Sequence, residues 1–77
     1  MSDYKPIPCR RYEDYELAIM HKARLRLTWE DGNVIYDQVV RPLDLRTAQG
    51  EEFLEFRDEQ GQAHSVRLDH IRRAEPV

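Results

Sequence analysis

Apolar positions along the chain repeat first with the period of a helix and then with the period of a strand. Over residues 12–22 they recur every three or four positions, which predicts a short amphipathic helix. The shared face consists of Tyr12, Tyr15, Ala18, Ile19 and Ala23. Leu17 and Met20 form a second, weaker apolar flank beside Glu13 and Glu16, so this flank is free either to dock a partner or to rest on the sheet.

The residues that precede the helix favour an extended segment, residues 1–10. Pro6 and Pro8 lack an amide donor, and each disfavours helical geometry at the residue before it. Cys9 is the chain's one cysteine and carries no motif of a reactive thiol. We expect it to pack as a small apolar side chain in or near the core.

Residues 24–73 largely alternate apolar and polar side chains with a period of two, which is typical of a half-buried β-sheet. The buried face of its first strand is expected to hold Leu25, Leu27 and Trp29. The pair Asp31-Gly32 then suits a tight hairpin turn, because both residue types tolerate a positive φ.

The return strand, residues 34–40, has apolar side chains at both odd and even positions and therefore on both faces. It either lies centrally in the sheet or carries a bulge. We expect Pro42 to end this strand, since proline cannot donate to a continuing ladder. The later elements expected are a loop or short helical turn at 43–50, strands at 52–57 and 63–68, a last short strand around Ile71 and a frayed end at 75–77.

One helix followed by about five closely connected strands predicts an α+β domain that is mainly β. A small sheet of this kind exposes its edges unless it closes, so we expect an antiparallel sheet curled into a barrel or sandwich. The chain has 77 residues, and we expect residues 1–77 to form one domain and a monomer.

The sequence offers little for catalysis or metal binding. His21, His64 and His70 have no recognised metal spacing with Cys9, and the three glycines are dispersed rather than gathered in a phosphate-binding loop. We therefore expect no enzyme activity, no cofactor and no metal. No apolar stretch approaches the ~20 residues that span a bilayer, and no signal segment is evident, so we expect a cytoplasmic protein without membrane contact.

The charge balance favours a protein partner over nucleic acid. The formal net charge is −3, and the excess lies in residues 51–77, which carry seven acidic and four basic side chains. Strong nonspecific nucleic-acid binding usually requires a basic patch, whereas an acidic surface suits a basic protein. Two other readings stay open: the acidic excess serves solubility alone, or a local basic strip forms from Arg24, Arg26, Arg41 and Arg46.

Several short segments, taken in order, resemble one known family. They are Tyr4, Pro6, Ile7, Cys9 and Tyr12 leading into Glu16-Leu17-Ala18, then Glu30-Asp31-Gly32, Glu52-Phe53-Leu54 and Val66-Arg67-Leu68-Asp69-His70-Ile71. In order and approximate spacing they resemble the Rof family of small bacterial proteins, which bind the termination factor Rho and inhibit it. The resemblance implies a helix-capped, barrel-like sheet similar to Sm proteins.

The same resemblance implies a mechanism and its residues. The protein would dock on the N-terminal RNA-binding domain of Rho, block RNA loading and so inhibit Rho-dependent termination, without binding nucleic acid itself. The family's helix contacts correspond here to Tyr12, Glu13 and Glu16, with Asp14 adjacent, and its middle-loop contacts align loosely with Arg46, Thr47, Ala48 and Gln49. We take Arg46 and Gln49 as the candidate loop contacts. Carboxylates suit the role because they can occupy the places that phosphates take in a basic groove.

Two features depart from the family pattern. Arg10-Arg11 follows the cysteine where relatives have acidic residues, and positive charge at a helix N-terminus is unfavourable. The chain is also longer around 40–42, before the middle loop. The alternatives to a Rho inhibitor are an Sm-like small-barrel RNA-binding module that uses Arg24, Arg26 and Tyr36, and an adaptor for another protein.

Overall fold

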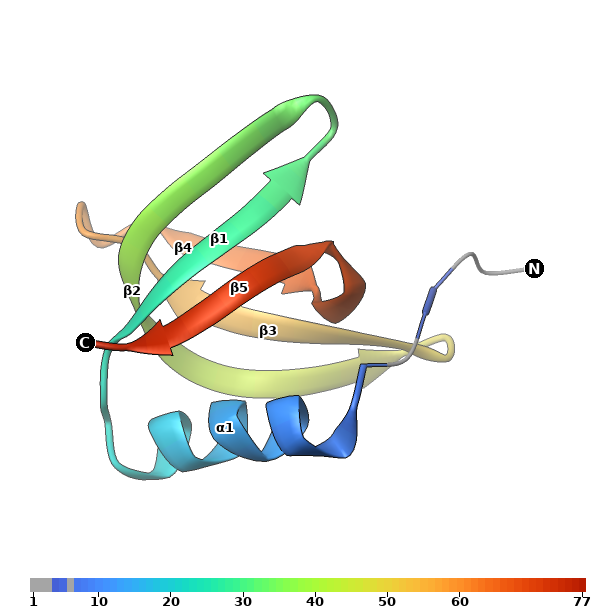
Figure 1. Ribbon diagram of the computed structural model, residues 1–77, viewed down its shortest axis with the longest axis horizontal. Coiled ribbons are helices and arrows are strands. Elements are labelled where there is room, and N and C mark those ends of the chain that lie inside the picture. The colour runs from blue at the N-terminus through green and yellow to red at the C-terminus, as the bar shows by residue number, and fades with distance from the viewer. Residues whose placement is uncertain (1–3, 6) are drawn as a thin grey trace.

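The computed structural model describes residues 4–5 and 7–77, which form one helix and a five-stranded antiparallel sheet (Figure 1). The elements are α1 (Cys9–Met20), β1 (Leu25–Asp31), β2 (Val34–Ala48), β3 (Glu51–Arg57), β4 (Ala63–Arg67), a 3-10 turn (Leu68–His70) and β5 (Ile71–Pro76). This order confirms the predicted α+β, mainly β class. The strand order is β4-β3-β2-β1-β5, and the sheet does not close, so the expected barrel or sandwich was too strong a statement.

The strand β2 serves both halves of this sheet. Its residues 34–40 pair with β1, and most of its residues from 41 to 48 pair with β3. The register shifts between Pro42 and Asp44, which marks a bulge, and β2 curves strongly in this part of its course (Figure 1). The predictions that Pro42 ends the strand and that 43–50 is a loop were therefore wrong. Proline is tolerated at a bulge, where the regular ladder is already interrupted.

Two tight turns set the register of the long strand. The β1–β2 turn consists of Gly32 and Asn33, with Gly32 at φ 61°, one residue later than the expected Asp31-Gly32 pair. The β2–β3 turn consists of Gln49 and Gly50, at φ 54° and 77°. Positive φ at these positions matches the twist that a two-residue hairpin needs.

The helix and the last strand both differ in extent from the prediction. α1 begins at Cys9, directly after Pro8, so residues 9 and 10 are helical rather than extended. The side chain of Cys9 lies outside the described part of the structure, as does Pro6. β5 continues to Pro76, which pairs with Leu25, so most of the expected frayed end is ordered strand. Edge position explains why a proline fits there, since its missing donor costs no ladder bond on the open side.

One apolar core lies between the helix and the two halves of the sheet. Its buried members are Tyr15, Ala18, Leu25, Leu27, Trp29, Val40, Leu54, Phe56, Leu68 and Ile71. Trp29 is 3% exposed, as its strand pattern predicted. Its ring packs edge-on against Phe56 at a centroid distance of 5.0 Å and stacks on Tyr36 at 5.2 Å. The core therefore fixes β1, β2 and β3 relative to one another.

Candidate protein-binding site

The helix α1 presents carboxylates to solvent because its opposite face is buried. Tyr15 and Ala18 are 0% and 6% exposed in the core, and α1 runs beside the second half of β2 (Figure 1). Glu13, Asp14 and Glu16 are all exposed. None of their three carboxylates makes a hydrogen bond or ion pair with another residue that the structure describes. We call these three residues the acidic face of α1.

An open groove of about 300 Å³ separates α1 from β2. It is lined by Tyr12, Glu16, Ile19, Met20, Asp44 and Leu45. Burial raises the pKa of the Tyr12 hydroxyl above its usual value, and the negative charges of Glu52, Glu16 and Asp44 raise it further. The phenol therefore stays protonated at neutral pH and can donate a hydrogen bond beside three carboxylates.

Asp44 and Glu52 enlarge the acidic surface beyond the predicted residues. The sequence interpretation placed Asp44 in a loop, and it reaches the groove because β2 continues past Pro42. The alternation of Leu43 and Leu45 with charged neighbours was the strand signal that could have located it.

The segment before α1 is tied to the sheet by polar contacts. The Tyr4 hydroxyl donates to Glu52 Oε2 at 3.1 Å, and the backbone amide of Lys5 donates to Asp69 Oδ2 at 3.2 Å. The guanidinium of Arg67 lies 5.8 Å from the centre of the Tyr4 ring. Burial, followed by the hydrogen bond with Glu52, raises the pKa of Tyr4 to about 12. These contacts fix the point at which α1 begins.

The two arginines at the start of α1 differ in their surroundings. Arg11 is half-buried and donates through Nη1 to the carbonyl of Ile71 at 3.4 Å, so its charge is directed toward β5. Arg10 is exposed. Pro8 precedes the helix and provides no side-chain cap, although its carbonyl accepts the Arg11 amide at 3.0 Å. The departure from the family pattern thus leaves the acidic face of α1 exposed.

The candidate loop residue Arg46 has its partners away from the acidic face of α1, and Gln49 lies in a turn. Arg46 donates to Glu55 Oε2 at 3.2 Å, and its guanidinium lies 5.0 Å from the centre of the Phe53 ring. These partners belong to β3, the neighbour of β2 in the sheet. Gln49 is exposed in the β2–β3 turn, which lies at the same end of the molecule as the start of α1 (Figure 1).

A family model described as modulator of Rho-dependent transcription termination (ROF) matches residues 6–77. The chain belongs to this family. The match confirms the Rof resemblance seen in the sequence and gives this ROF-family chain a general role in modulating Rho-dependent transcription termination.

Comparison with solved structures adds the fold alone. Proteasome accessory factor B/C (PafBC) of Arthrobacter aurescens is similar with a TM-score of 0.80 and 21% identity, over 97% of this chain and 12% of that chain. The ROF-family chain therefore spans a small part of that protein. No curated protein matches the chain.

His64 of the ROF-family chain packs against its neighbours in the sheet. His64 contacts Asp58 Oδ2 at 2.8 Å and stacks on Phe56 at 5.2 Å. The hydrogen bond from His64 lowers the pKa of Asp58 below its usual value. Within residues 4–5 and 7–77, no group of three or more His, Cys, Asp or Glu side chains is arranged to hold a metal ion. No helix in the same ranges is long and apolar enough to cross a membrane.

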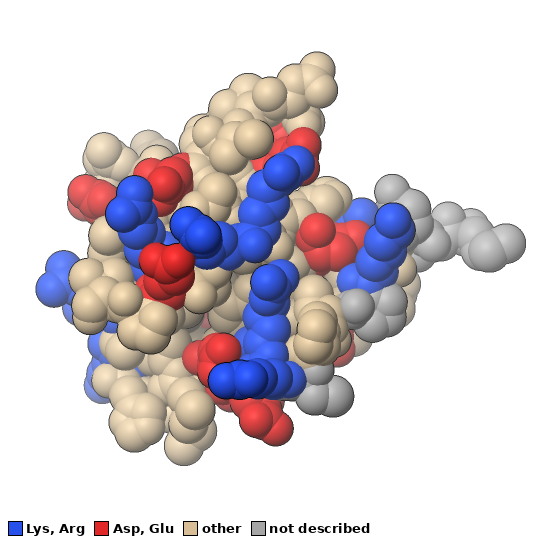
Figure 2. Space-filling view, in the orientation of Figure 1, with Lys and Arg blue, Asp and Glu red and all other residues tan. Residues whose placement is uncertain are grey.

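Many charged side chains of the ROF-family chain lie close to opposite charges. Figure 2 shows Lys and Arg interspersed with Asp and Glu over the visible face. Arg26 pairs with Asp37 at 3.0 Å and Arg46 with Glu55 at 3.2 Å, so two of the four arginines considered for a basic strip are neutralised. The unpaired carboxylates of α1 stand out against this background.

Proposed function

We propose that this ROF-family chain binds Rho through the acidic face of α1 and the adjoining α1–β2 groove, and that it thereby blocks RNA loading on the N-terminal RNA-binding domain of Rho. The observation that carries the proposal is the set of three exposed carboxylates, Glu13, Asp14 and Glu16, which have no partner among the described residues. The Rho docking itself is what the Rof resemblance implies, and membership of a family that modulates Rho-dependent termination supports it.

The contrast with the other acidic residues supports this choice of surface. Many carboxylates elsewhere are already engaged, including Glu30 with Arg72, Asp37 with Arg26, Glu55 with Arg46, Asp58 with His64, Asp69 with Arg67 and Glu75 with Arg73. A salt bridge already offsets much of a carboxylate's charge, so a paired carboxylate attracts a further cation less strongly. The carboxylates of α1 have no such offset among the described residues.

An acidic helix is well suited to compete with RNA. A groove that binds RNA presents Arg and Lys to phosphates, and carboxylates can accept the same charge-assisted hydrogen bonds. Because α1 is packed rigidly through Tyr15 and Ala18, little conformational freedom is lost on docking. Tyr12 adds a hydroxyl donor and an aromatic ring at the edge of the same surface, a side-chain type enriched at binding hot spots.

The mechanism is stoichiometric occupancy of the RNA site. The chain acts without a cofactor and without a covalent step, since masking a basic groove is sufficient to exclude RNA. The net charge of −3 favours rapid encounter with a basic surface, and this steering weakens as salt screens it.

A competition assay with charge-reversal variants tests the proposal. Purified protein is added to Rho bound to fluorescently labelled C-rich RNA, and RNA release is followed by anisotropy. We expect release at roughly stoichiometric protein, and an apparent affinity that falls by more than about tenfold in Glu13→Lys/Glu16→Lys, because favourable charge contacts become repulsive.

The matched control is Asp31→Lys/Glu75→Lys, which makes the same change in net charge on exposed sheet residues. It should compete nearly as well as the parent. Equal losses of apparent affinity in both variants would show that only the net charge matters. Full activity of the helix variant would show that α1 does not contact Rho. Direct RNA binding by the protein alone would instead favour the RNA-binding alternative.

A further inference from the structure

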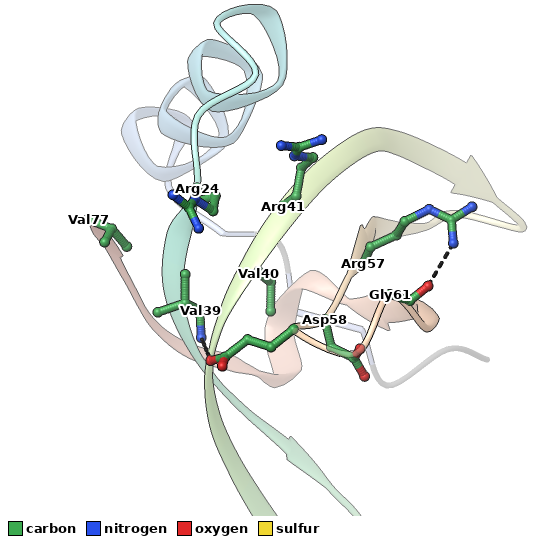
Figure 3. A pocket seen from close by; sticks show the side chains of 9 residues that line it. Arg24, Val39, Val40, Arg41, Arg57, Asp58, Gly61 and Val77 are labelled. Carbon is green, nitrogen blue, oxygen red and sulfur yellow. Dashed lines mark hydrogen bonds between the residues drawn. The ribbon is translucent and has the colours of Figure 1, made fainter.

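Three arginines lie near the bulge of β2: Arg24 just before β1, Arg41 in β2 and Arg57 at the end of β3. Arg41 of β2 and Arg57 of β3 are direct cross-strand partners. Leu25, the first residue of β1, pairs with Val40, and Arg24 directly precedes it, so Arg24 and Arg41 line the same cleft. Directly opposed residues of antiparallel strands project from the same face of the sheet. We call Arg24, Arg41 and Arg57 the arginine row (Figure 3).

Two members of the arginine row lack a partner. Arg57 donates through Nη1 to the carbonyl of Gly61 at 2.8 Å, and Figure 3 shows its guanidinium directed there. Arg24 and Arg41 are exposed, and their guanidiniums make no hydrogen bond or ion pair with residues 4–5 or 7–77. Like charges placed directly opposite one another are destabilising, so the row has an electrostatic cost that a bound anion would relieve.

The carboxylates beside the row are committed to other contacts. Asp58 accepts backbone amides of its own turn through Oδ1 and contacts His64 through Oδ2. Glu59 Oε1 accepts the amide of Val39 at 3.3 Å. These bonds shape the β3–β4 turn and hold the carboxylates in place. Neither acid forms an ion pair with Arg24 or Arg41.

The arginine row borders an open cleft of about 630 Å³. Its apolar wall includes Val39, Val40 and Val77. The volume falls within the range of about 300–1,000 Å³ that is typical of small-molecule sites. A free phosphate ion would leave much of this space empty, whereas a phosphate carried on a small organic molecule could also contact the valines.

We propose that the arginine row is a binding site for a small phosphate monoester. A monoester carries close to two negative charges at neutral pH and three acceptor oxygens, which matches two unpaired guanidiniums better than a single carboxylate does. The planar guanidinium forms paired hydrogen bonds with phosphate oxygens. The site is built from the residue before β1, from β2, from the end of β3 and from the β3–β4 turn, and it shares no residue with the acidic face of α1.

Amide chemical-shift titration tests this site with defined probes. Inorganic phosphate, adenosine 5′-monophosphate and adenosine are each added to the labelled protein against a sodium chloride baseline of equal ionic strength. We expect saturable shifts at 24–25, 39–41 and 57–61 with the two phosphate probes, tighter binding of the nucleotide, and no such response to adenosine. Adenosine shifts equal to those of the nucleotide, or no saturable response to either phosphate probe, would overturn the proposal.

Charge-neutralising variants locate the effect. Arg24→Gln/Arg41→Gln should weaken nucleotide binding by more than about tenfold, because two charge-assisted contacts are lost. Arg26→Gln/Arg72→Gln removes the same charge from exposed, paired arginines and should bind as the parent does. All four positions are exposed, so both variants should keep the fold, as amide spectra will verify. Unchanged affinity in the first variant would place the nucleotide elsewhere.

A further arm distinguishes the source of the phosphate. Short RNA with and without a 5′-phosphate competes against the nucleotide. Competition that requires the 5′-phosphate supports a monoester site that takes an RNA end, while no competition by either RNA supports a free small molecule. Equal competition by both RNAs would overturn the monoester proposal in favour of backbone phosphodiesters. Glu13→Lys/Glu16→Lys should leave nucleotide binding unchanged, so this test is independent of Rho binding.

Discussion

The acidic face of α1 and the arginine row are two surfaces of opposite charge that share one property. In each, charged side chains lie exposed and without ionic partners among the described residues, although carboxylates and guanidiniums elsewhere are often paired. The two surfaces differ in the structure that positions their side chains. The helix carries its carboxylates on a solvent-facing stripe, whereas strand register sets the arginines side by side. A net charge of −3 reveals neither, because it averages two local excesses.

The largest loss is expected from a change in the core on which both surfaces rest. Trp29→Ala should lower the free energy of unfolding by about 3–5 kcal/mol, because it deletes a buried aromatic side chain and leaves a cavity. Urea unfolding followed by circular dichroism gives this value. Tyr36→Ala is a suitable control, since Tyr36 stacks on Trp29 but is 36% exposed, and it should cost less. A Trp29→Ala variant as stable as the parent would contradict the assigned core.

A crossed charge experiment then tests whether the two surfaces are separate. Glu13→Lys/Glu16→Lys should lose more than about tenfold in Rho competition and nothing in nucleotide binding. Arg24→Gln/Arg41→Gln should show the reverse pattern. Anisotropy with Rho and amide titration with adenosine 5′-monophosphate supply the two measurements. Loss of both activities in either variant would show that the surfaces are coupled through one partner or one conformational change.

The acidic face of α1 was largely predictable from the sequence, since its position follows from local periodicity. The helical spacing placed Tyr12 toward the sheet side and Glu13 and Glu16 toward solvent, as the structure has them. The same applies to β1, where alternation identified Trp29 as buried. Such inferences succeed because each depends on residues within a turn or two of the chain.

The arginine row was not predictable in the same way. It depends on pairing between three segments far apart in sequence, and that pairing depends on turn positions and on the bulge after Pro42. The local rule that proline ends a strand gave way because pairing with β3 continues on the far side of the bulge. Arg24 and Arg41 were named as possible neighbours, but Arg57 was not.

The thermal stability at acid pH should depend on Asp58, in the turn beside the arginine row. The hydrogen bond from His64 holds the pKa of Asp58 below its usual value, so Asp58 stabilises the fold above its unfolded pKa of about 3.9. This contribution should be lost as the pH falls from there through the lowered folded-state pKa. Asp58→Asn should therefore show a weaker decline of thermal stability over that acid range. A decline as steep as the parent's would place the acid-sensitive group elsewhere.

The smallest expected effect concerns the electrostatic cost of the arginine row itself. Arg41→Gln should raise the free energy of unfolding by about 0.2–1 kcal/mol at low salt, because it removes the central charge between two like-charged neighbours. Arg26→Gln is the matched control and should be neutral or slightly destabilising, since Arg26 pairs with Asp37. Thermal unfolding at low and high salt gives both values, and screening should shrink the Arg41→Gln gain. If Arg41→Gln destabilises the protein at low salt as Arg26→Gln does, the arginines do not repel one another. A bound anion would then have no repulsion to relieve.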